Sequence, residues 1–172
     1  MSQFRERVRT EYAQLYLADD QSWGGADWDT LYFGRHPIGL LGTAPGEAIL
    51  ATGLRSGFIS FAVSVADDDP GPDLDGYEDI VETAFEARHA EVSLIEGGGE
   101  RSHRLPALPA GAGWYRMRYH CRGMDEGNHA SVNFDVGRII DEYLLQIWPA
   151  QATSPATVKV TSRCAYYLIY DS

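Results

Sequence analysis

The sequence has little or none of several features that identify large protein classes. It contains one lysine, Lys159, two cysteines, Cys121 and Cys164, and no apolar run near the roughly 18 to 20 residues that span a bilayer. The missing apolar run excludes a membrane-spanning helix and predicts a soluble protein with no membrane partner. The single lysine leaves arginine as almost the only basic residue, and its planar fork suits carboxylate and phosphate partners.

The known catalytic signatures are also missing. The sequence has no G-x-S-x-G, H-E-x-x-H or C-x-x-C motif and no glycine-rich phosphate loop with its lysine. Histidines are scattered over different predicted elements, so a metal site would require the fold to gather them: His36, His89, His103, His120 and His129. We therefore expect no catalytic residues, no metal, no cofactor and no enzymatic activity. A hydrolase that combines Asp and His from separate strands stays open as an alternative.

The features that are present describe a packed globular protein. With 172 residues, 44% hydrophobic and 12% aromatic, the chain suits one domain over residues 1–172. The start, MSQFRERVRTEYAQ, has arginines but no following apolar stretch, so we expect no secretory signal and a cytoplasmic location. We expect Cys121 and Cys164 to be reduced there, and a disulfide between them is the alternative.

Charge is distributed very unevenly along the chain. The net charge is -11, and residues 61–100 alone carry 1 basic and 12 acidic residues, whereas residues 101–124 carry 5 basic residues and no acidic one. Such asymmetry bears on partners and solubility more than on the fold. A protein this acidic repels nucleic acid at long range, so we expect no nucleic-acid partner.

The acidic segment ADDDPGPDLDGYED concentrates the negative charge. Its carboxylates are Asp67, Asp68, Asp69, Asp73, Asp75, Glu78 and Asp79. Three interpretations stand. The segment is a solvated loop, or a calcium site whose spacing does not match the EF-hand pattern, or a surface that binds a basic protein partner and imitates nucleic-acid phosphates.

The basic stretch GWYRMRYHCRG, residues 113–123, has the period of two that is typical of a strand with one buried face. Tyr115, Met117, Tyr119 and Cys121 form the apolar face. The other face carries Arg116, Arg118, His120 and Arg122, which we call the basic row. It either pairs with Glu82 and Glu86 on a neighbouring strand at residues 78–88, as exposed pairs worth at most about 1 kcal/mol each, or lines an anion-binding groove.

Other segments alternate in the same way or contain turn residues. We predict strands at residues 7–18, 48–52, 57–66, 78–88 and 113–123, short strands joined by a turn at residues 97–99, a strand ending at Pro149, and two strand segments after residue 156. A short helix is the alternative at residues 7–18, and one strand with a bulge near Ser162 is the alternative after residue 156. We expect residues 48–66 to form a hairpin, residues 124–139 to form a polar loop, and no helix. The predicted fold is an all-β, single-domain antiparallel β-sandwich of about eight to ten strands with long ordered loops.

The long loop before residue 47 is rich in glycine, proline and aromatic residues. Trp23, Trp28 and Tyr32 in this loop are candidates for stacking on a ring. A β-sandwich that binds a glycan or calcium through its aromatic and acidic loops is therefore the alternative function.

The order of EAILATG, FISFAVSV, the acidic segment, YEDIVETAFEARHAEVSLIEGG, HRLPALPAGAGWYRMRYHCRG and IDEYLLQIWPA resembles the competence-associated nuclease inhibitors, the ComJ-like proteins. The resemblance covers about residues 40–150 and is one of layout, and it carries over no site residue. It implies a small acidic β-sandwich that binds and blocks a nuclease. The sequence thus favours a non-enzymatic protein-binding module whose partner is a basic protein such as a nuclease or toxin.

Overall fold

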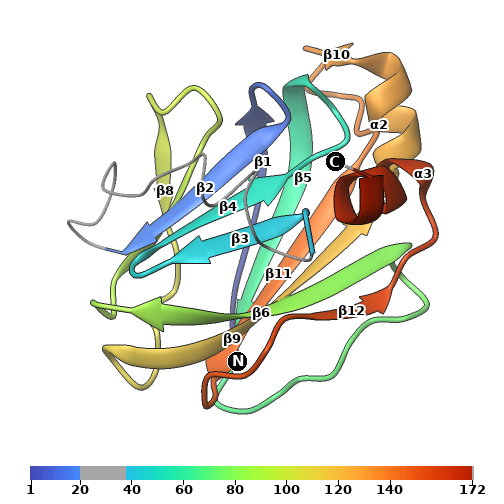
Figure 1. Ribbon diagram of the computed structural model, residues 1–172. Helices are drawn as coiled ribbons and strands as arrows, with labels where there is room; N and C mark the ends of the chain where they lie inside the picture. Colours follow the sequence, from blue (N-terminus) through green and yellow to red (C-terminus); the bar gives the residue numbers. More distant parts are fainter. Residues whose placement is uncertain (20–37, 172) are drawn as a thin grey trace.

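The computed structural model describes residues 1–19 and 38–171 of the chain, and their strands form two sheets that pack face to face (Figure 1). The seven-stranded sheet A has the order β1 (Ser2–Thr10), β5 (Ser56–Val65), β11 (Glu142–Pro149), β9 (Gly113–Arg122), β6 (Asp79–Ala87) and β12 (Ala156–Lys159), with β10 (Val132–Asn133) also paired to β5. The five-stranded sheet B has the order β3 (Leu41–Ala44), β4 (Glu47–Ala51), β2 (Gln14–Asp19), β7 (Val92–Ile95) and β8 (Ser102–Arg104). The architecture is a β-sandwich made of two open sheets.

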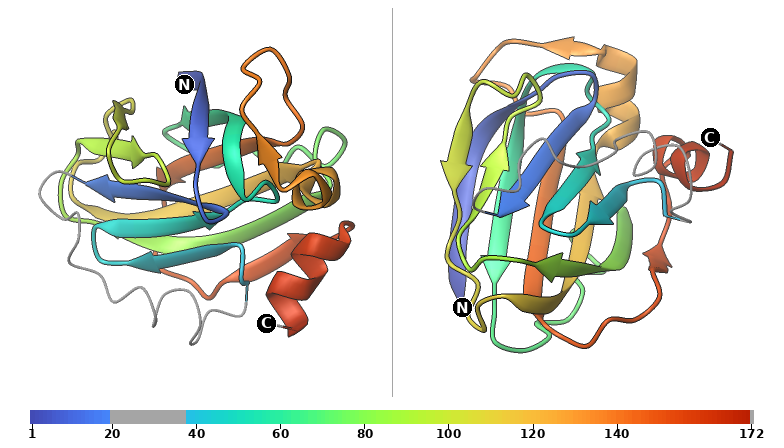
Figure 2. Two further views of the ribbon diagram at one scale, coloured as in Figure 1. Left: turned by 90° about the horizontal axis from the view of Figure 1, so that it is seen from above. Right: turned by 60° about the vertical axis from the view of Figure 1, so that its left-hand side comes forward.

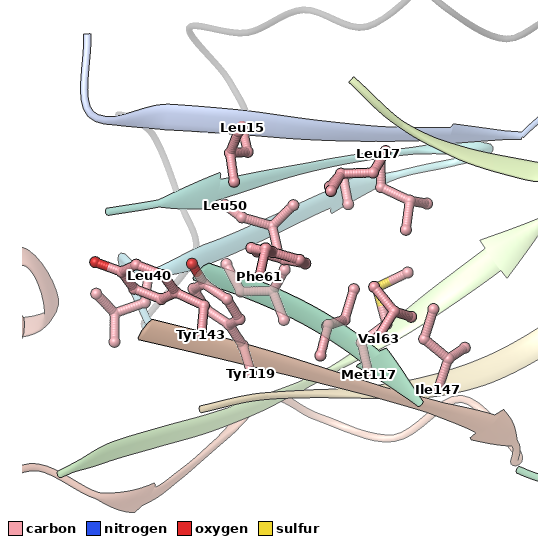
Figure 3. Close-up of a cluster of buried hydrophobic side chains, with 14 of the residues drawn as sticks. Leu15, Leu17, Leu40, Leu50, Phe61, Val63, Met117, Tyr119, Tyr143 and Ile147 are labelled. Carbon is pink, nitrogen blue, oxygen red and sulfur yellow. The ribbon is translucent and has the colours of Figure 1, made fainter. Parts of the chain in front are cut away.

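The hydrophobic core lies between the two sheets. Phe61, Tyr119 and Tyr143 project from sheet A toward Leu15 and Leu50 of sheet B, and all five are buried (Figure 3). The apolar faces predicted for two strands are confirmed, because these residues are buried on the core side of β5 and β9: Ile59, Phe61, Val63, Val65, Tyr115, Met117, Tyr119 and Cys121.

Sheet A is mixed, so the prediction of a purely antiparallel sandwich is wrong. β11 pairs parallel to β5, with Leu144 opposite Ala62, and β10 also pairs parallel to β5. β11 pairs antiparallel to β9, and β9 antiparallel to β6. Between β5 and β11 the chain passes through both β6 and β9, so no tight turn requires these two neighbours to be antiparallel.

The predicted strand at residues 7–18 and the predicted hairpin at residues 48–66 each contain a crossing between the sheets. The strand predicted at residues 7–18 is two strands, β1 in sheet A and β2 in sheet B, separated by a turn in which Tyr12 and Ala13 have positive φ angles of 55° and 58°. The predicted hairpin at residues 48–66 is wrong, because β4 belongs to sheet B and β5 to sheet A. Gly53 lies in this second crossing, where a Cβ atom would come within 2.3 Å of the Met124 carbonyl oxygen.

Helices replace part of what we predicted as loop and strand. The predicted polar loop contains α2 (Met124–Ala130), and the segment after β12 contains α3 (Arg163–Tyr166) followed by a turn of π-helix (Tyr167–Asp171). This C-terminal segment lies at the periphery of the two sheets (Figure 2). No helix among the described residues has the length and apolar character that crossing a membrane requires.

The start of α3 depends on contacts with distant parts of the chain. The Asp125 carboxylate accepts hydrogen bonds from the backbone N–H groups of Arg163 and Cys164, and the Ser162 hydroxyl accepts one from Ala165 N–H. The hydroxyl of Ser162 in turn donates to Asp79. Because Asp79 and Asp125 are far away in sequence, local residue patterns do not reveal this helix start.

The hairpin of β7 and β8 around residues 97–99, the strand at residues 78–88 and the strand ending at Pro149 are confirmed. Cys121 and Cys164 are free thiols. Burial raises the pKa of Cys164 to about 11, so this thiol stays protonated at neutral pH.

Candidate functional site

The acidic segment joins β5 to β6, and we call residues 66–78 the acidic loop. These two strands lie in the same sheet but are separated by β11 and β9, so the loop crosses the ends of two intervening strands on its way between them. In Figure 1 it is the green connection leading into β6. The topology therefore places the acidic loop against side chains of the outer face of sheet A.

Arg118 on β9 makes the strongest contact with the acidic loop. Its Nη1 and Nη2 atoms donate to the two carboxylate oxygens of Asp69, at 2.8 and 3.2 Å. The hydrogen bond from Arg118 lowers the pKa of the Asp69 carboxyl group, although burial opposes this shift. The Asp69 side chain is 53% exposed, so the pair joins the surface loop to an arginine side chain that is itself 4% exposed.

Two neighbouring side chains hold the next residues of the loop. Gln146 on β11 donates from Nε2 to the Gly71 carbonyl oxygen at 3.0 Å. His120 on β9 accepts the backbone N–H of Asp73 at its Nε2 atom, at 3.2 Å, and its Nδ1 atom lies 3.2 Å from the Leu144 carbonyl oxygen. A neutral imidazole with its proton on Nδ1 satisfies both contacts.

The far end of the acidic loop is held by two more basic side chains. Arg122 donates to the Gly76 carbonyl oxygen at 3.2 Å, and its guanidinium lies 5.6 Å from the centre of the Tyr77 ring. Lys159 on β12 donates to the carbonyl oxygens of Leu74 and Tyr77, both at 2.7 Å. The loop is thus attached to β9, β11 and β12 from Asp69 to Tyr77.

The carboxylates of the acidic segment divide into exposed and buried groups. Six of the seven carboxylates belong to exposed residues of the loop, and one of these, Asp69, is bound by Arg118: Asp67, Asp68, Asp69, Asp73, Asp75 and Glu78. Asp79 is 0% exposed and accepts hydrogen bonds from Thr161 and Ser162 backbone N–H groups and from the Ser162 hydroxyl. We therefore correct its assignment to the partner-binding set, because a carboxylate enclosed by the chain cannot reach a partner.

The basic row faces its own acidic neighbour. Glu82 lies opposite Arg118 in the register of β6 and β9, and it accepts hydrogen bonds from Arg118 Nε at 2.6 Å and Arg116 Nε at 3.1 Å. Glu86 lies opposite Trp114 instead. The predicted pairing with Glu82 is confirmed.

Each member of the basic row also has further partners within the chain. Arg116 donates to the carbonyl oxygens of Thr153 and Ser154, and Arg122 forms an ion pair with Glu142 at 2.8 Å. Arg116, Arg118 and His120 are buried, whereas Arg122 is exposed. The assumption that Arg118 forms an exposed pair is wrong, because the acidic loop and the side chains of β11 cover it.

Sequence reasoning missed the part that Gln146 takes in this site. The period of two in β11 could have predicted it. Gln146 lies between Leu145 and Ile147, which face the core, so Gln146 belongs to the outer face. Trp23, Trp28 and Tyr32 lie outside the described residues. Among residues 1–19 and 38–171, no group of three or more His, Cys, Asp or Glu side chains is arranged to hold a metal ion.

His120 makes the stability of the fold sensitive to acid. Burial lowers its pKa from 6.5 to about 4, and the nearby Arg118 contributes to the same shift. The unfolded chain therefore takes up this proton below about pH 6.5, whereas the folded chain takes it up only near pH 4, so acid favours unfolding. We expect proton uptake by His120 in the unfolded chain to lower the free energy of unfolding by about 2 kcal/mol as the pH falls from 7 to 5.

Urea unfolding of the native chain and of His120→Gln at both pH values measures this effect. Glutamine keeps an acceptor for Asp73 N–H but does not titrate. The other titratable groups are the same in both proteins, including Asp141, whose pKa is raised by burial. The difference between the two pH dependences isolates His120. Parallel pH dependences would contradict the prediction.

The chain shares its fold with two solved structures, although no family model and no curated protein sequence matches it. One structure is that of ComJ from Bacillus subtilis, described as an inhibitor of the DNA-degrading activity of NucA, with a TM-score of 0.53 and 16% identity over 87% of this chain and 98% of that one. The other is described as crocagin biosynthetic gene J, with a TM-score of 0.56 and 10% identity over 88% of this chain and 100% of that one. The resemblance to ComJ-like proteins expected from the sequence is confirmed as a likeness of fold.

Proposed function

We propose that this chain is a non-enzymatic binding protein that uses the acidic loop to bind a basic protein, and that the bound protein is a nuclease whose activity it blocks. One observation carries the proposal: besides Asp69, five exposed carboxylates project from a loop whose backbone and Asp69 side chain are held by the sheet. They are Asp67, Asp68, Asp73, Asp75 and Glu78.

Charge complementarity is the physical basis of the proposal. Proteins that bind nucleic acid contact its phosphates with arginine and lysine side chains. A row of carboxylates at fixed positions is complementary in charge to that same basic surface. A net charge of -11 speeds the approach of a basic partner by attraction at long range. The likeness of fold to ComJ, whose description names a DNA-degrading activity that it inhibits, supports a nuclease as the partner.

Affinity capture from a lysate of the source organism tests the proposal. We expect the native chain to retain a basic protein, and a variant with neutral loop side chains to lose at least about tenfold in affinity, equal to about 1.4 kcal/mol. The variant replaces the five exposed carboxylates, as D67N, D68N, D73N, D75N and E78Q. The captured protein is then assayed for DNA degradation with and without the native chain.

A second variant with the same net charge separates the loop from overall electrostatics. It neutralises five exposed carboxylates elsewhere on the surface, as E6Q, E91Q, E100Q, D135N and D171N. We expect this control to keep most of the affinity. Equal capture by both variants would rule out the acidic loop as the contact surface. If the captured protein does not degrade DNA, or degrades it equally well with the native chain present, the partner is not a nuclease that this chain blocks.

A further inference from the structure

Arg118 joins the centre of sheet A to the acidic loop. It lies in the middle of β9, a central strand of sheet A, yet its guanidinium contacts the loop directly through Asp69. We propose that Arg118 is the positioning residue of the acidic loop, and that it holds the exposed carboxylates in the arrangement that a basic partner recognises. This inference rests on the proposed function and adds how the binding loop is organised.

The Arg118 guanidinium donates four hydrogen bonds to partners within the chain. Its Nε atom donates to Glu82 at 2.6 Å, its two Nη atoms form a two-pronged pair with Asp69, and Nη1 also lies 3.0 Å from Gln146 Oε1. The plane lies over the Trp148 ring, 4.6 Å from its centre. The Arg118 side chain is 4% exposed and is contacted on several sides, so its guanidinium has little freedom to move. Its two-pronged pair therefore fixes both the position and the orientation of the Asp69 carboxylate.

The position of Asp69 is passed on to the residues after it. The Gly71 backbone N–H donates to Asp69 Oδ1 at 2.8 Å, which forms a turn, and Gln146 holds the Gly71 carbonyl oxygen on the other side. Asp73 follows, with its N–H bonded to His120 and its Oδ1 atom accepting from Gly76 N–H at 2.8 Å. Arg118 thus begins a continuous series of contacts that runs to the far end of the loop.

This series divides the acidic carboxylates by task. Asp69 uses both oxygens on Arg118 and Gly71, and Asp79 is enclosed by the start of α3, so these two carboxylates serve the structure. Asp73 and Glu78 each use one oxygen atom on a backbone N–H group, and together with Asp67, Asp68 and Asp75 they stay exposed for recognition. A loop that is already ordered loses less conformational entropy on binding, which lowers the dissociation rate of a complex.

Arg118→Lys tests the inference without changing the net charge. A lysine ammonium cannot reproduce the two-pronged pair with Asp69 while also bonding Glu82 and Gln146. Hydrogen exchange at the Gly71, Asp73 and Gly76 amides of the free chain is the first measurement. We expect exchange to be at least about tenfold faster in Arg118→Lys, which corresponds to about 1.4 kcal/mol.

Arg116→Lys is the matched control. Arg116 belongs to the same strand and face and also bonds Glu82, but its other partners are Thr153 and Ser154 and not the acidic loop. We expect exchange of the loop amides to be unchanged in this variant. Gln146→Leu, which also keeps the net charge and removes the contact with Gly71, provides a second test if Arg118→Lys does not fold.

Binding kinetics with the basic protein captured by the native chain provide the second measurement. Because the net charge is the same, we expect Arg118→Lys to leave the association rate within about twofold and to raise the dissociation rate about tenfold. Arg116→Lys is expected to change neither. Unchanged exchange or unchanged dissociation in Arg118→Lys, or in Gln146→Leu where Arg118→Lys does not fold, would overturn the inference.

The two proposals fail in different ways. If the native chain captures no basic protein, the proposed function fails, but exchange in the free chain still decides whether Arg118 positions the loop. If capture succeeds and the loop amides exchange at native rates in Arg118→Lys, the partner proposal stands and the positioning role of Arg118 is rejected. Faster exchange with unchanged dissociation would show that loop order does not contribute to binding, which also rejects the inference.

Discussion

Replacing Tyr119 with alanine is expected to lower the free energy of unfolding by about 3 to 5 kcal/mol, the range for removing a large buried aromatic side chain. Tyr119 is 0% exposed and lies between the two sheets, with its ring 5.6 Å from the Tyr143 ring and 6.2 Å from the Phe61 ring. Truncation leaves a cavity that the neighbouring strands cannot close, because both sheets are fixed by their own hydrogen bonds. Urea unfolding followed by tryptophan fluorescence measures the loss.

Tyr119→Phe is the control, because it keeps the ring and removes only the hydroxyl group. That hydroxyl donates to the Ala51 carbonyl oxygen of β4 at 2.9 Å and so joins the two sheets. We expect a cost of about 1 to 2 kcal/mol for this single buried hydrogen bond. If Tyr119→Ala cost no more than Tyr119→Phe, the position of the ring in the core would be wrong.

The sequence predicts the central strands β5, β11, β9 and β6 of sheet A well, because one face packed on the core produces a period of two. In β5 and β9 this period identifies the side chains on the core side correctly, and it also predicts that Glu82 meets the basic row. It does not predict that Arg116, Arg118 and His120 on the other face of β9 are buried as well. The partner of a strand is harder to predict. The parallel pairing of β5 with β11 and the placement of β4 and β5 in different sheets depend on contacts between residues far apart in the chain.

The helices and the support of the acidic loop lie beyond sequence patterns for the same reason. Asp125 accepts the first N–H group of α3, and Asp79 accepts the N–H and hydroxyl groups of Ser162 just before the helix. Neither aspartate is near α3 in the sequence. The sequence identifies the acidic loop and the basic row separately as charged segments. Their contact through Asp69 and Arg118 follows from the crossing of the loop over β11 and β9, which only the fold determines.

Arg118→Ala is expected to cost about 3 kcal/mol of unfolding free energy, whereas the exposed pair assumed from the sequence predicts at most about 1 kcal/mol. The difference arises from burial. Arg118 is 4% exposed and Glu82 15%, so removing the guanidinium leaves Glu82 with Arg116 alone and frees the acidic loop from the sheet. The cost stays near the lower end of the range for breaking a buried pair, because Asp69 is half exposed and regains water.

Arg122→Ala on the same face is the comparison that decides between burial and charge. Its ion pair with Glu142 joins side chains that are 46% and 32% exposed, so we expect a loss below about 1 kcal/mol. Both substitutions remove one positive charge from β9, and any difference between them in urea unfolding reflects the surroundings of the guanidinium. Equal losses would mean that the acidic loop does not shield Arg118 from water in solution, and the contact between Arg118 and Asp69 would then contribute no more than an ordinary surface pair.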